Sequence, residues 1–425
     1  MTAASLTALD VERIRKDFPI LERQVNGRPL VYLDSAASAQ RPQVVLDAMT
    51  AYYEKHHANV HRGIYTLAEE ATAMYEGARD AVAELLNAPS RDEVVFTKNV
   101  TEAFNLVARS IGDAPKGSPL HVGAGDEVLI TEMEHHSNIV PWQMLCERTG
   151  ATLRWLGITD EGRLDLSNLD ELLTERTRIV SFTLQSNLLG TVNPTSQIVR
   201  RAREVGAIVL VDAAQAVPHS VVDVQELGVD LLGFTGHKAC GPTGIGVLWG
   251  RRELLEQMPP FLGGGEMIET VTMERSTYAG IPHRFEAGTP MIAEAVGLHA
   301  AVDYLREVGL DRIKAHEKEL AAYALEALSD VPGLRVVGPR TAVGRGGAIS
   351  FTMAEVHPHD VGQVLDELAI AVRVGQHCAA PVCRRLGVPA TTRASFYLYT
   401  TTAEVDALVE GLHHVRRFFE GSVRR

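Results

Sequence analysis

The sequence has few cysteines. Four occur in 425 residues, at Cys146, Cys240, Cys378 and Cys383. Four are too few for a disulfide framework at this length, and no two of them form the CxxC pair of zinc or redox sites. A cysteine with a special role here should therefore act through its thiolate. Cys146 and Cys240 are interpreted as small buried side chains.

Long apolar runs and excess positive charge are also missing. No stretch approaches the roughly 18 uninterrupted apolar residues of a membrane helix, and the first 19 residues contain no apolar signal-peptide core. The formal net charge is −13, and no cluster of lysine and arginine reverses it locally. Such a chain repels phosphate backbones and anionic lipid. We therefore expect a cytoplasmic protein that binds neither nucleic acid nor membranes.

A regular alternation fills the middle of the chain. From about residue 94 to 250, short β-branched runs such as EVVFTK, EVLITEM and AIVLVDAA alternate with helical patterns. This alternation predicts βαβ units, and hence an α/β fold with a mainly parallel sheet covered by helices on both faces. Ligands of such sheets bind at the carboxyl ends of the strands.

The C-terminal third has a different pattern. A long amphipathic helical stretch at about 293–328 leads into shorter strands and helices, which indicates a smaller α+β domain. We expect three parts: an N-terminal segment at 1–30 that packs on the body, a large domain at 31–295, and a small domain at 296–425. The small domain carries Cys378.

Two charged residues follow predicted buried strands. Lys238 lies in TGHKACGPTG, where a strand runs into a glycine-rich turn, and Asp212 ends the strand AIVLVD. A desolvated lysine has a lowered pKa and can form a Schiff base. A buried carboxylate needs a partner, and the protonated nitrogen of a pyridine ring is one. The pair predicts a pyridoxal-phosphate (PLP) site, although each residue alone also fits a solvated loop lysine or a helix N-cap.

Two more polar residues fall at strand ends. Thr101, in TKNVTEAFNL, lies where a helix begins, so that its hydroxyl and the neighbouring amides can bind a phosphate. His135, in ITEMEHHSN, could stack its flat ring on a pyridine face. Taken singly, each fits an ordinary cap or loop residue; together with Lys238 and Asp212 they favour one cofactor site.

The motifs EHHSN, VDAAQ, TGHKACGPTG, FEAGTP and RVGQHCAAP occur in this order. In this respect the chain resembles the SufS-type (group II) cysteine desulfurases, which are fold-type I PLP enzymes, and the resemblance extends over nearly the whole chain. It implies that Lys238 forms the Schiff base, Asp212 binds the pyridine nitrogen, Gln215 contacts the ring hydroxyl and His135 stacks on the ring as a catalytic residue. It also implies phosphate contacts from Thr101, Thr235, His237 and, out of the other subunit of a homodimer, Thr289.

The resemblance implies a substrate site as well. Arg393 would bind the substrate carboxylate, a role suited to its planar guanidinium. Asn187, Arg373 and His61 would lie nearby.

Cys378 is the residue that distinguishes this reaction from others on the same fold. It lies in a polar turn with Arg373 and His377, where positive charge favours a thiolate. The resemblance makes it the acceptor of sulfur from L-cysteine. Gln376 stands where the family commonly has a histidine, which leaves no acid role at that position. Cys383 is interpreted as an inert neighbour, and His377, Cys378 and Cys383 lack the spacing of a metal site, so no metal is expected.

The predicted function is therefore PLP-dependent transfer of sulfur from L-cysteine to Cys378, with release of L-alanine, for iron-sulfur cluster assembly. Selenocysteine lyase activity with L-selenocysteine, aminotransferase or kynureninase-like chemistry, and a non-catalytic scaffold are the alternatives. The HPHD motif at 357–360 resembles that of desulfurases that work with a zinc-containing SufU acceptor. His359 is thus a candidate zinc-exchanging ligand for such an acceptor, and a helix cap at Asp360 or His359 is the alternative.

Overall fold

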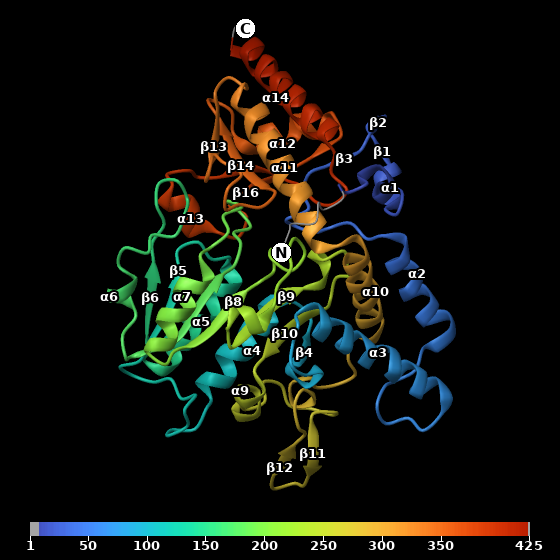
Figure 1. The fold of residues 1–425 in the computed structure, drawn as a ribbon, viewed down its shortest axis with the longest axis vertical. Coiled ribbons are helices and arrows are strands. Elements are labelled where there is room, and N and C mark those ends of the chain that lie inside the picture. Colours follow the sequence, from blue (N-terminus) through green and yellow to red (C-terminus); the bar gives the residue numbers. More distant parts are fainter. Residues whose placement is uncertain (1–7, 424–425) are drawn as a thin grey trace, which may run out of the picture.

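A seven-stranded sheet forms the centre of the larger part of the molecule (Figure 1). The structure is a computed structural model that describes residues 8–423. The strand order is β4-β10-β9-β8-β7-β5-β6, and only β10 runs against its neighbours. The strands are β4 (Val94–Thr97), β5 (Glu127–Thr131), β6 (Thr152–Leu156), β7 (Thr177–Thr183), β8 (Ile208–Asp212), β9 (Leu231–Thr235) and β10 (Gly246–Gly250). The predicted mainly parallel α/β sheet is confirmed.

Helices cover this sheet on both faces because its strands are apolar on both sides. On one face Phe104 and Trp142 pack with Val128; on the other, Tyr75 and Phe182 belong to a second core. The covering helices are α2 (Gln43–Ala51), α3 (Thr66–Leu85), α4 (Val100–Gly112), α5 (Val140–Thr149), α6 (Leu169–Leu172), α7 (Thr195–Glu204), α8 (Val224–Leu227), α9 (Arg252–Gln257) and α10 (Ile292–Val308).

A smaller antiparallel sheet with the order β13-β14-β17-β16 builds the C-terminal part. Its core includes Phe351, Leu365 and Leu408. The strands are β13 (Leu334–Val337), β14 (Ala348–Met353), β16 (Arg373–Gly375) and β17 (Thr391–Ser395), and the helices are α11 (Leu310–Ser329), α12 (Pro358–Glu367), α13 (Ala380–Arg385) and α14 (Thr402–Val423).

The two parts are not divided where the sequence suggested. The predicted boundary at 295/296 falls inside α10, whose Leu298 and Leu305 are buried in the large core. The helical stretch expected at 293–328 consists of two helices, which are separated at Gly309, where φ is +90°. Glycine adopts this conformation without the steric cost that other residues carry.

The N-terminal region joins both parts. It contains α1 (Val11–Arg15), a 3₁₀ turn η1 (Pro19–Glu22), and the short strands β1 (Gln24–Val25), β2 (Arg28–Pro29) and β3 (Val31–Tyr32). Phe18 packs edge-on against Tyr304 and Tyr399. Strand β3 pairs in parallel with β15 (Ile370–Ala371), and Leu33 is buried in the core of the small domain. The start of the predicted large domain thus belongs structurally with the C-terminal part.

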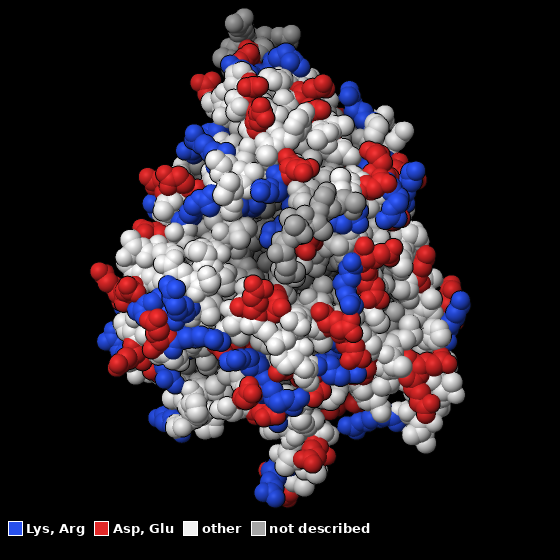
Figure 2. Space-filling view, viewed as in Figure 1, with Lys and Arg blue, Asp and Glu red and all other residues white. Residues whose placement is uncertain are grey.

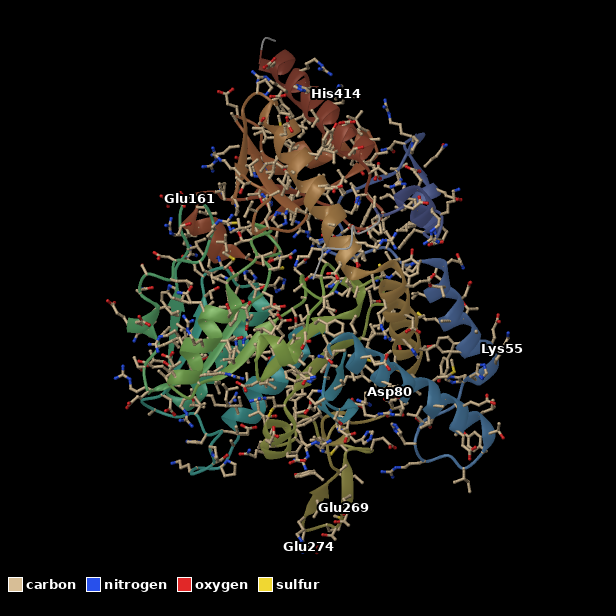
Figure 3. The ribbon with its side chains drawn as sticks, in the orientation of Figure 1. Lys55, Asp80, Glu161, Glu269, Glu274 and His414 are labelled. Carbon is tan, nitrogen blue, oxygen red and sulfur yellow. The ribbon has the colours of Figure 1, made fainter. Side chains whose placement is uncertain are left out.

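A hairpin of β11 (Ile268–Val271) and β12 (Ser276–Tyr278) projects from the large domain, with Glu269 and Glu274 on it (Figures 1 and 3). At the opposite end of the molecule His414 marks α14 (Figure 3). Acidic and basic side chains are intermixed over the face seen in Figure 2, which shows no extended basic patch. Of the helices in the described range, none is long and apolar enough to cross a membrane.

Candidate active site

A cavity of about 200 Å³ lies at the carboxyl ends of the large-domain strands and reaches the small domain. Eleven of the predicted site residues line it: Thr101, His135, Asn187, Asp212, Gln215, Thr235, His237, Lys238, Arg373, Cys378 and Arg393. The site therefore lies where a parallel α/β sheet ordinarily holds its ligand.

Lys238 and Asp212 both line this cavity, Asp212 buried and Lys238 partly buried. Lys238 follows β9 in the short turn η5 (Gly236–Lys238), and Asp212 is the last residue of β8. Burial lowers the pKa of Lys238 to about 8, and the charge of Asp212 offsets part of that shift. Burial likewise raises the pKa of Asp212, which accepts one hydrogen bond at 2.9 Å from the Ala214 amide. The arrangement keeps a nucleophilic amine and a carboxylate in one desolvated pocket.

His135 presents a neutral ring to the same cavity. Burial lowers its pKa to about 3, with a further contribution from the charge of Lys238. Its Nδ1 atom lies 2.5 Å from Ser137 Oγ and accepts a hydrogen bond from the Ser137 amide. These contacts fix the ring orientation, as a stacking role requires.

Four polar residues that line the cavity near the start of α4 form a polar cradle: Asn99, Thr101, Thr235 and His237. The Asn99 side chain caps this helix by accepting a hydrogen bond from the Glu102 amide at 2.9 Å, and Thr101 lies in the first turn. Within the described chain, Thr235 Oγ1 is buried without a hydrogen-bond partner. Burial lowers the pKa of His237 to about 4. Because a buried hydroxyl ordinarily has a partner, the cradle fits a group rich in acceptor oxygens, such as a phosphate.

Arg393 lies in the interior of β17 rather than beside an apolar strand. Its Nη1 donates to the Asn187 carbonyl at 2.8 Å and its Nη2 to Asp34 at 3.0 Å. Its Nε is buried without a partner in the described structure. Arg373 is half exposed and lies 3.6 Å from the other oxygen of Asp34. Asp34, which the sequence reading missed, holds both guanidinium groups at the cavity.

Cys378 is exposed on a loop with an unusual backbone. His377 and Cys378 have φ values of +52° and +56°, the left-handed region that non-glycine residues seldom occupy. Side chains and amides from the large domain hold the loop: the His136 amide donates to the Cys378 carbonyl and Asn187 Nδ2 to the His377 carbonyl, both at 2.7 Å. His136 Nε2 also accepts from the Ala380 amide. The exposed thiol is thereby fixed at the rim of the cavity.

The other cysteines have different surroundings. Cys240 and Cys383 are buried, and burial raises their pKa values to about 12 and about 11. Both stay protonated at neutral pH, which agrees with inert roles. Cys146 is only half-buried, contrary to the expected full burial. Gln376 donates from Nε2 to the Pro389 carbonyl at 3.2 Å.

Two predicted residues lie outside this cavity. His61 lines a second cavity of about 210 Å³, where its Nε2 lies 2.9 Å from Glu76 Oε1. Gly288 and Pro290, which flank Thr289, line the same second cavity. A single chain therefore does not bring His61 near the predicted substrate site. The contribution of Thr289 across a dimer stays a prediction.

Glu134 is a further buried group that the sequence reading missed. Burial raises its pKa to about 8. Its carboxyl group accepts from Thr131, from Asn138 and from the Thr183 amide. The acidic residue in EMEHH was visible in the sequence, but nothing in the strand pattern indicated that it turns inward.

Comparisons with known proteins agree with this geometry. A family model described as aminotransferase class-V matches residues 31–408. A probable cysteine desulfurase from Streptomyces coelicolor is 67% identical over 412 residues, which are 97% of this chain and 98% of that protein. A cysteine desulfurase from Dickeya dadantii is 52% identical over 408 residues, which are 96% of this chain and 97% of that protein.

Solved structures give the same result. The cysteine desulfurase CsdA from Escherichia coli, in an S-sulfonic acid form, superposes with a TM-score of 0.88 at 38% identity, over 97% of this chain and 100% of that one. The apo cysteine desulfurase from Thermococcus onnurineus gives a TM-score of 0.90 at 38% identity, over 97% and 99% of the two chains. The chain therefore belongs to the aminotransferase class-V family and, within it, to the cysteine desulfurases.

Proposed function

We propose that the protein is a PLP-dependent cysteine desulfurase of the SufS type, which converts L-cysteine to L-alanine and carries the sulfur as a persulfide on Cys378 for iron-sulfur cluster assembly. One observation supports this most: an exposed thiol, Cys378, stands at the rim of the cavity that Lys238 and the buried Asp212 also line. Aminotransferase or kynureninase-like chemistry needs no thiol there.

The residues of the cavity fit the cofactor. Lys238 would bind its aldehyde carbon, Asp212 its pyridine nitrogen, Gln215 its ring hydroxyl and His135 its ring face. Thr101, Thr235 and His237 would hold its phosphate. The unpartnered Thr235 hydroxyl and the buried Asp212 carboxylate are the groups that such a ligand would satisfy. When bound, PLP supplies an electron sink that weakens bonds around the amino acid's α-carbon.

The protein residues then have distinct tasks. Arg393 and Arg373 orient the substrate carboxylate, with Asp34 keeping their guanidinium groups in place. The freed amine of Lys238 removes the Cα proton, a role that suits a pKa of about 8. Burial in the cavity excludes water from this proton transfer.

Sulfur transfer is the task of Cys378. Its thiolate attacks the substrate sulfur, so that an S–S bond forms on the enzyme while the substrate Cβ–S bond breaks. Two proton transfers complete L-alanine: one proton, equivalent to that lost by the Cys378 thiol, goes to Cβ, and the proton held by Lys238 returns to Cα. The sum is L-cysteine and the Cys378 thiol giving L-alanine and the Cys378 persulfide, with no net oxidant or reductant. A dithiol or an acceptor protein then removes the outer sulfur.

The reaction class is tested by product stoichiometry. Holoenzyme is incubated with L-cysteine and a dithiol reductant, and alanine and sulfide are measured in the same samples. We expect equal amounts of the two products. Pyruvate and ammonia in place of alanine would instead indicate a lyase, and alanine without sulfide would contradict sulfur transfer.

The partners belong to the same proposal. We propose a homodimer in which Thr289 reaches the other subunit's site, and a SufU-like acceptor that docks near His359. His359 is exposed at the start of α12, and its ring stacks on that of His357 with centroids 5.3 Å apart. The HPHD motif does begin a helix, with His359 and Asp360 in its first turn. The capping residue is His357, whose Nδ1 accepts from the His359 amide at 3.2 Å. This leaves the His359 ring free of a capping task. The cytoplasmic location stays a prediction.

A further inference from the structure

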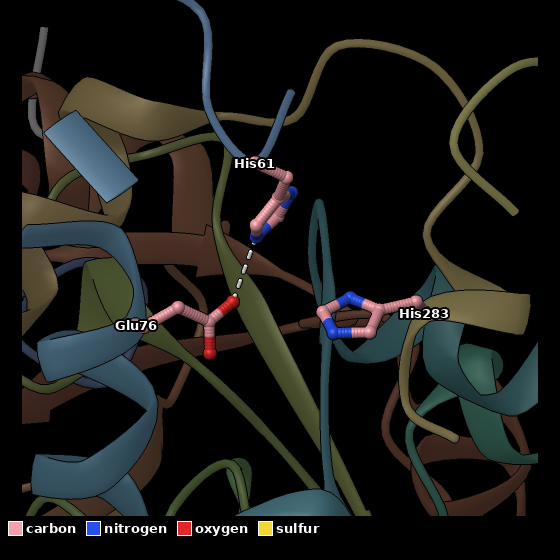
Figure 4. A group of neighbouring side chains, drawn as sticks. All are labelled: His61, Glu76 and His283. Carbon is pink, nitrogen blue, oxygen red and sulfur yellow. Dashed lines mark hydrogen bonds and ion pairs between the residues drawn. The ribbon is translucent and has the colours of Figure 1, made fainter. Parts of the chain in front are cut away.

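A second group of chemically capable side chains lies away from the candidate active site. His61 comes from the loop before α3, Glu76 from α3, and His283 from the 3₁₀ turn η6 (His283–Phe285) (Figure 4). One ring nitrogen of each histidine and one oxygen of Glu76 lie within 4.8 Å of one another. Among the described residues, no other set of three His, Cys, Asp or Glu side chains comes this close.

We propose that His61, Glu76 and His283 form a binding site for a divalent first-row transition metal ion, with Zn²⁺ as its probe. The donor set is two imidazoles and one carboxylate, the set that open zinc and non-haem iron sites use. Tetrahedral zinc with bonds of about 2.0 to 2.1 Å holds its ligands roughly 3.4 Å apart. The three atoms reach that spacing by small side-chain rotations, since His61 Nε2 and Glu76 Oε1 are already 2.9 Å apart.

The surroundings prepare the carboxylate for this role. Arg79 Nε and Arg91 Nη2 donate to Glu76 Oε2 at 3.0 and 2.5 Å. Oε1 faces His61 and accepts one longer hydrogen bond from Arg79 Nη2 at 3.3 Å. Arg79 is itself fixed, because it is buried and pairs with Glu286 at 2.7 Å. Partners that orient a ligand in this way are a regular feature of metal sites. The two arginines also share the charge of Glu76, so the preference should be for metals that bind imidazole rather than for Mg²⁺ or Ca²⁺.

The histidines are suitable donors. The rings of His61 and His283 approach edge to face with centroids 5.1 Å apart, and both point into the space beside Glu76 (Figure 4). The His61 backbone is held by a hydrogen bond from its amide to Thr72 Oγ1 at 2.9 Å.

The cluster opens into a cavity that can complete the coordination. This second cavity, of about 210 Å³, is lined by His61, His283, Glu266 and Glu286 among others. A single water needs only about 10 to 15 Å³. There is consequently room for the water molecules or small ligand that fill the remaining positions of a metal held by three protein atoms.

Zinc binding to the holoenzyme tests the proposal by equilibrium dialysis against Zn²⁺. The measurements use a Cys378→Ser background, because an exposed thiolate binds zinc by itself. We expect one zinc ion per chain. Its affinity should fall at least about tenfold in His283→Gln or His61→Gln, because even the loss of a residue that only orients a ligand lowers metal affinity by that factor. His414→Gln, on α14, and His359→Ala are the matched histidine controls, and both should keep the zinc.

The structure of the bound ion gives a second readout. X-ray absorption of the zinc-loaded Cys378→Ser protein should show two imidazoles and oxygen ligands, with no sulfur. Unchanged affinity in both His283→Gln and His61→Gln, or loss of zinc in His359→Ala alone, would overturn the assignment. Retained cofactor content and an unchanged urea midpoint in His283→Gln show that a loss of zinc is local and does not reflect unfolding.

Discussion

Single residues at strand ends carry most of the predicted chemistry. Lys238, Asp212 and Thr101 could be placed from the sequence because each follows an apolar strand or begins a helix, and the ends of parallel strands converge. Asp34 and Glu134 could not, because whether a carboxylate turns inward depends on partners from distant segments. Asp34 is held by Arg393, which lies 359 residues away along the chain.

The depressed pKa of Lys238 predicts how cofactor capture depends on pH. Only the neutral amine attacks an aldehyde, and an amine with a pKa of about 8 is mostly protonated below that pH. The rate at which apoenzyme forms a borohydride-trapped adduct with PLP should therefore fall roughly tenfold per unit below about pH 7. Lys238→Ala should form no borohydride-trapped adduct. The affinity of this variant for PLP, measured at each pH, corrects the rates for changes in PLP binding that arise from ionisation of the cofactor. A flat rate between pH 6 and 9 would contradict the assignment.

The contrast between two thiols predicts a second outcome. Cys378→Ser should still bind PLP and L-cysteine but accumulate no protein persulfide, with sulfide production lowered at least about a hundredfold, as expected for loss of a nucleophile. Cys383→Ser is the matched control and should still form the persulfide on Cys378, because Cys383 is buried and its thiol has a raised pKa. Persulfide is measured by mass spectrometry after alkylation. Wild-type sulfide release from Cys378→Ser would show that its thiol is not the sulfur acceptor.

At the scale of elements, the local sequence patterns predicted correctly whether a segment is a helix or a strand, but they predicted less well where each element begins and ends. The strands predicted at EVLITEM and AIVLVDAA are β5 and β8, and the helix start indicated by the HPHD motif belongs to α12. Helix α12, however, begins at Pro358 with His357 as its cap, since imidazole nitrogen can replace the usual hydroxyl or carboxylate acceptor. The sequence alone could not distinguish which histidine of the HPHD motif faces its own backbone.

At the start of α12, we expect one histidine to affect recognition of the acceptor and the other to affect stability of the helix. His359→Ala should leave dithiol-driven alanine formation within about twofold of wild type but remove stimulation by a SufU-like acceptor, because a zinc ligand is lost. His357→Ala should instead lower the free energy of unfolding by about 1 kcal/mol through loss of the cap. Activity is titrated with the acceptor, and stability is measured in urea. Equal stimulation of His359→Ala and wild type would remove the acceptor role.

At the scale of the whole molecule, the sequence indicated two domains but not how they share the chain. Helix α10 packs with the large domain, while β3 near the N-terminus pairs with β15 in the small one. Pairing over such distances leaves no periodic signal in either segment. The two lobes also meet through a buried pair, His219 Nδ1 and Glu317 Oε1 at 2.7 Å, of which Glu317 lies on α11.

This buried pair predicts a stability effect. Burial raises the pKa of Glu317, and His219 counteracts that shift. His219→Ala leaves the carboxyl group buried without this partner, and we expect a loss of about 3 to 5 kcal/mol of unfolding free energy. The double variant His219→Ala/Glu317→Leu should recover part of it, because no buried charge remains. Urea unfolding of the holoenzyme measures both. A double variant as unstable as the single one would show that packing, and not charge, sets the loss.

The pairing of the chain's beginning with its end has a consequence for biosynthesis. During translation, the segment that holds Asp34 leaves the ribosome 359 residues before Arg393 does. Domains fold as they emerge, and contacts between distant segments must wait for both partners. The large sheet can therefore assemble while synthesis continues, but the contact between Arg393 and Asp34 at the cavity cannot form until later. A nascent or truncated chain that lacks β17 would bind the proposed cofactor without Arg393, the proposed anchor of the substrate carboxylate.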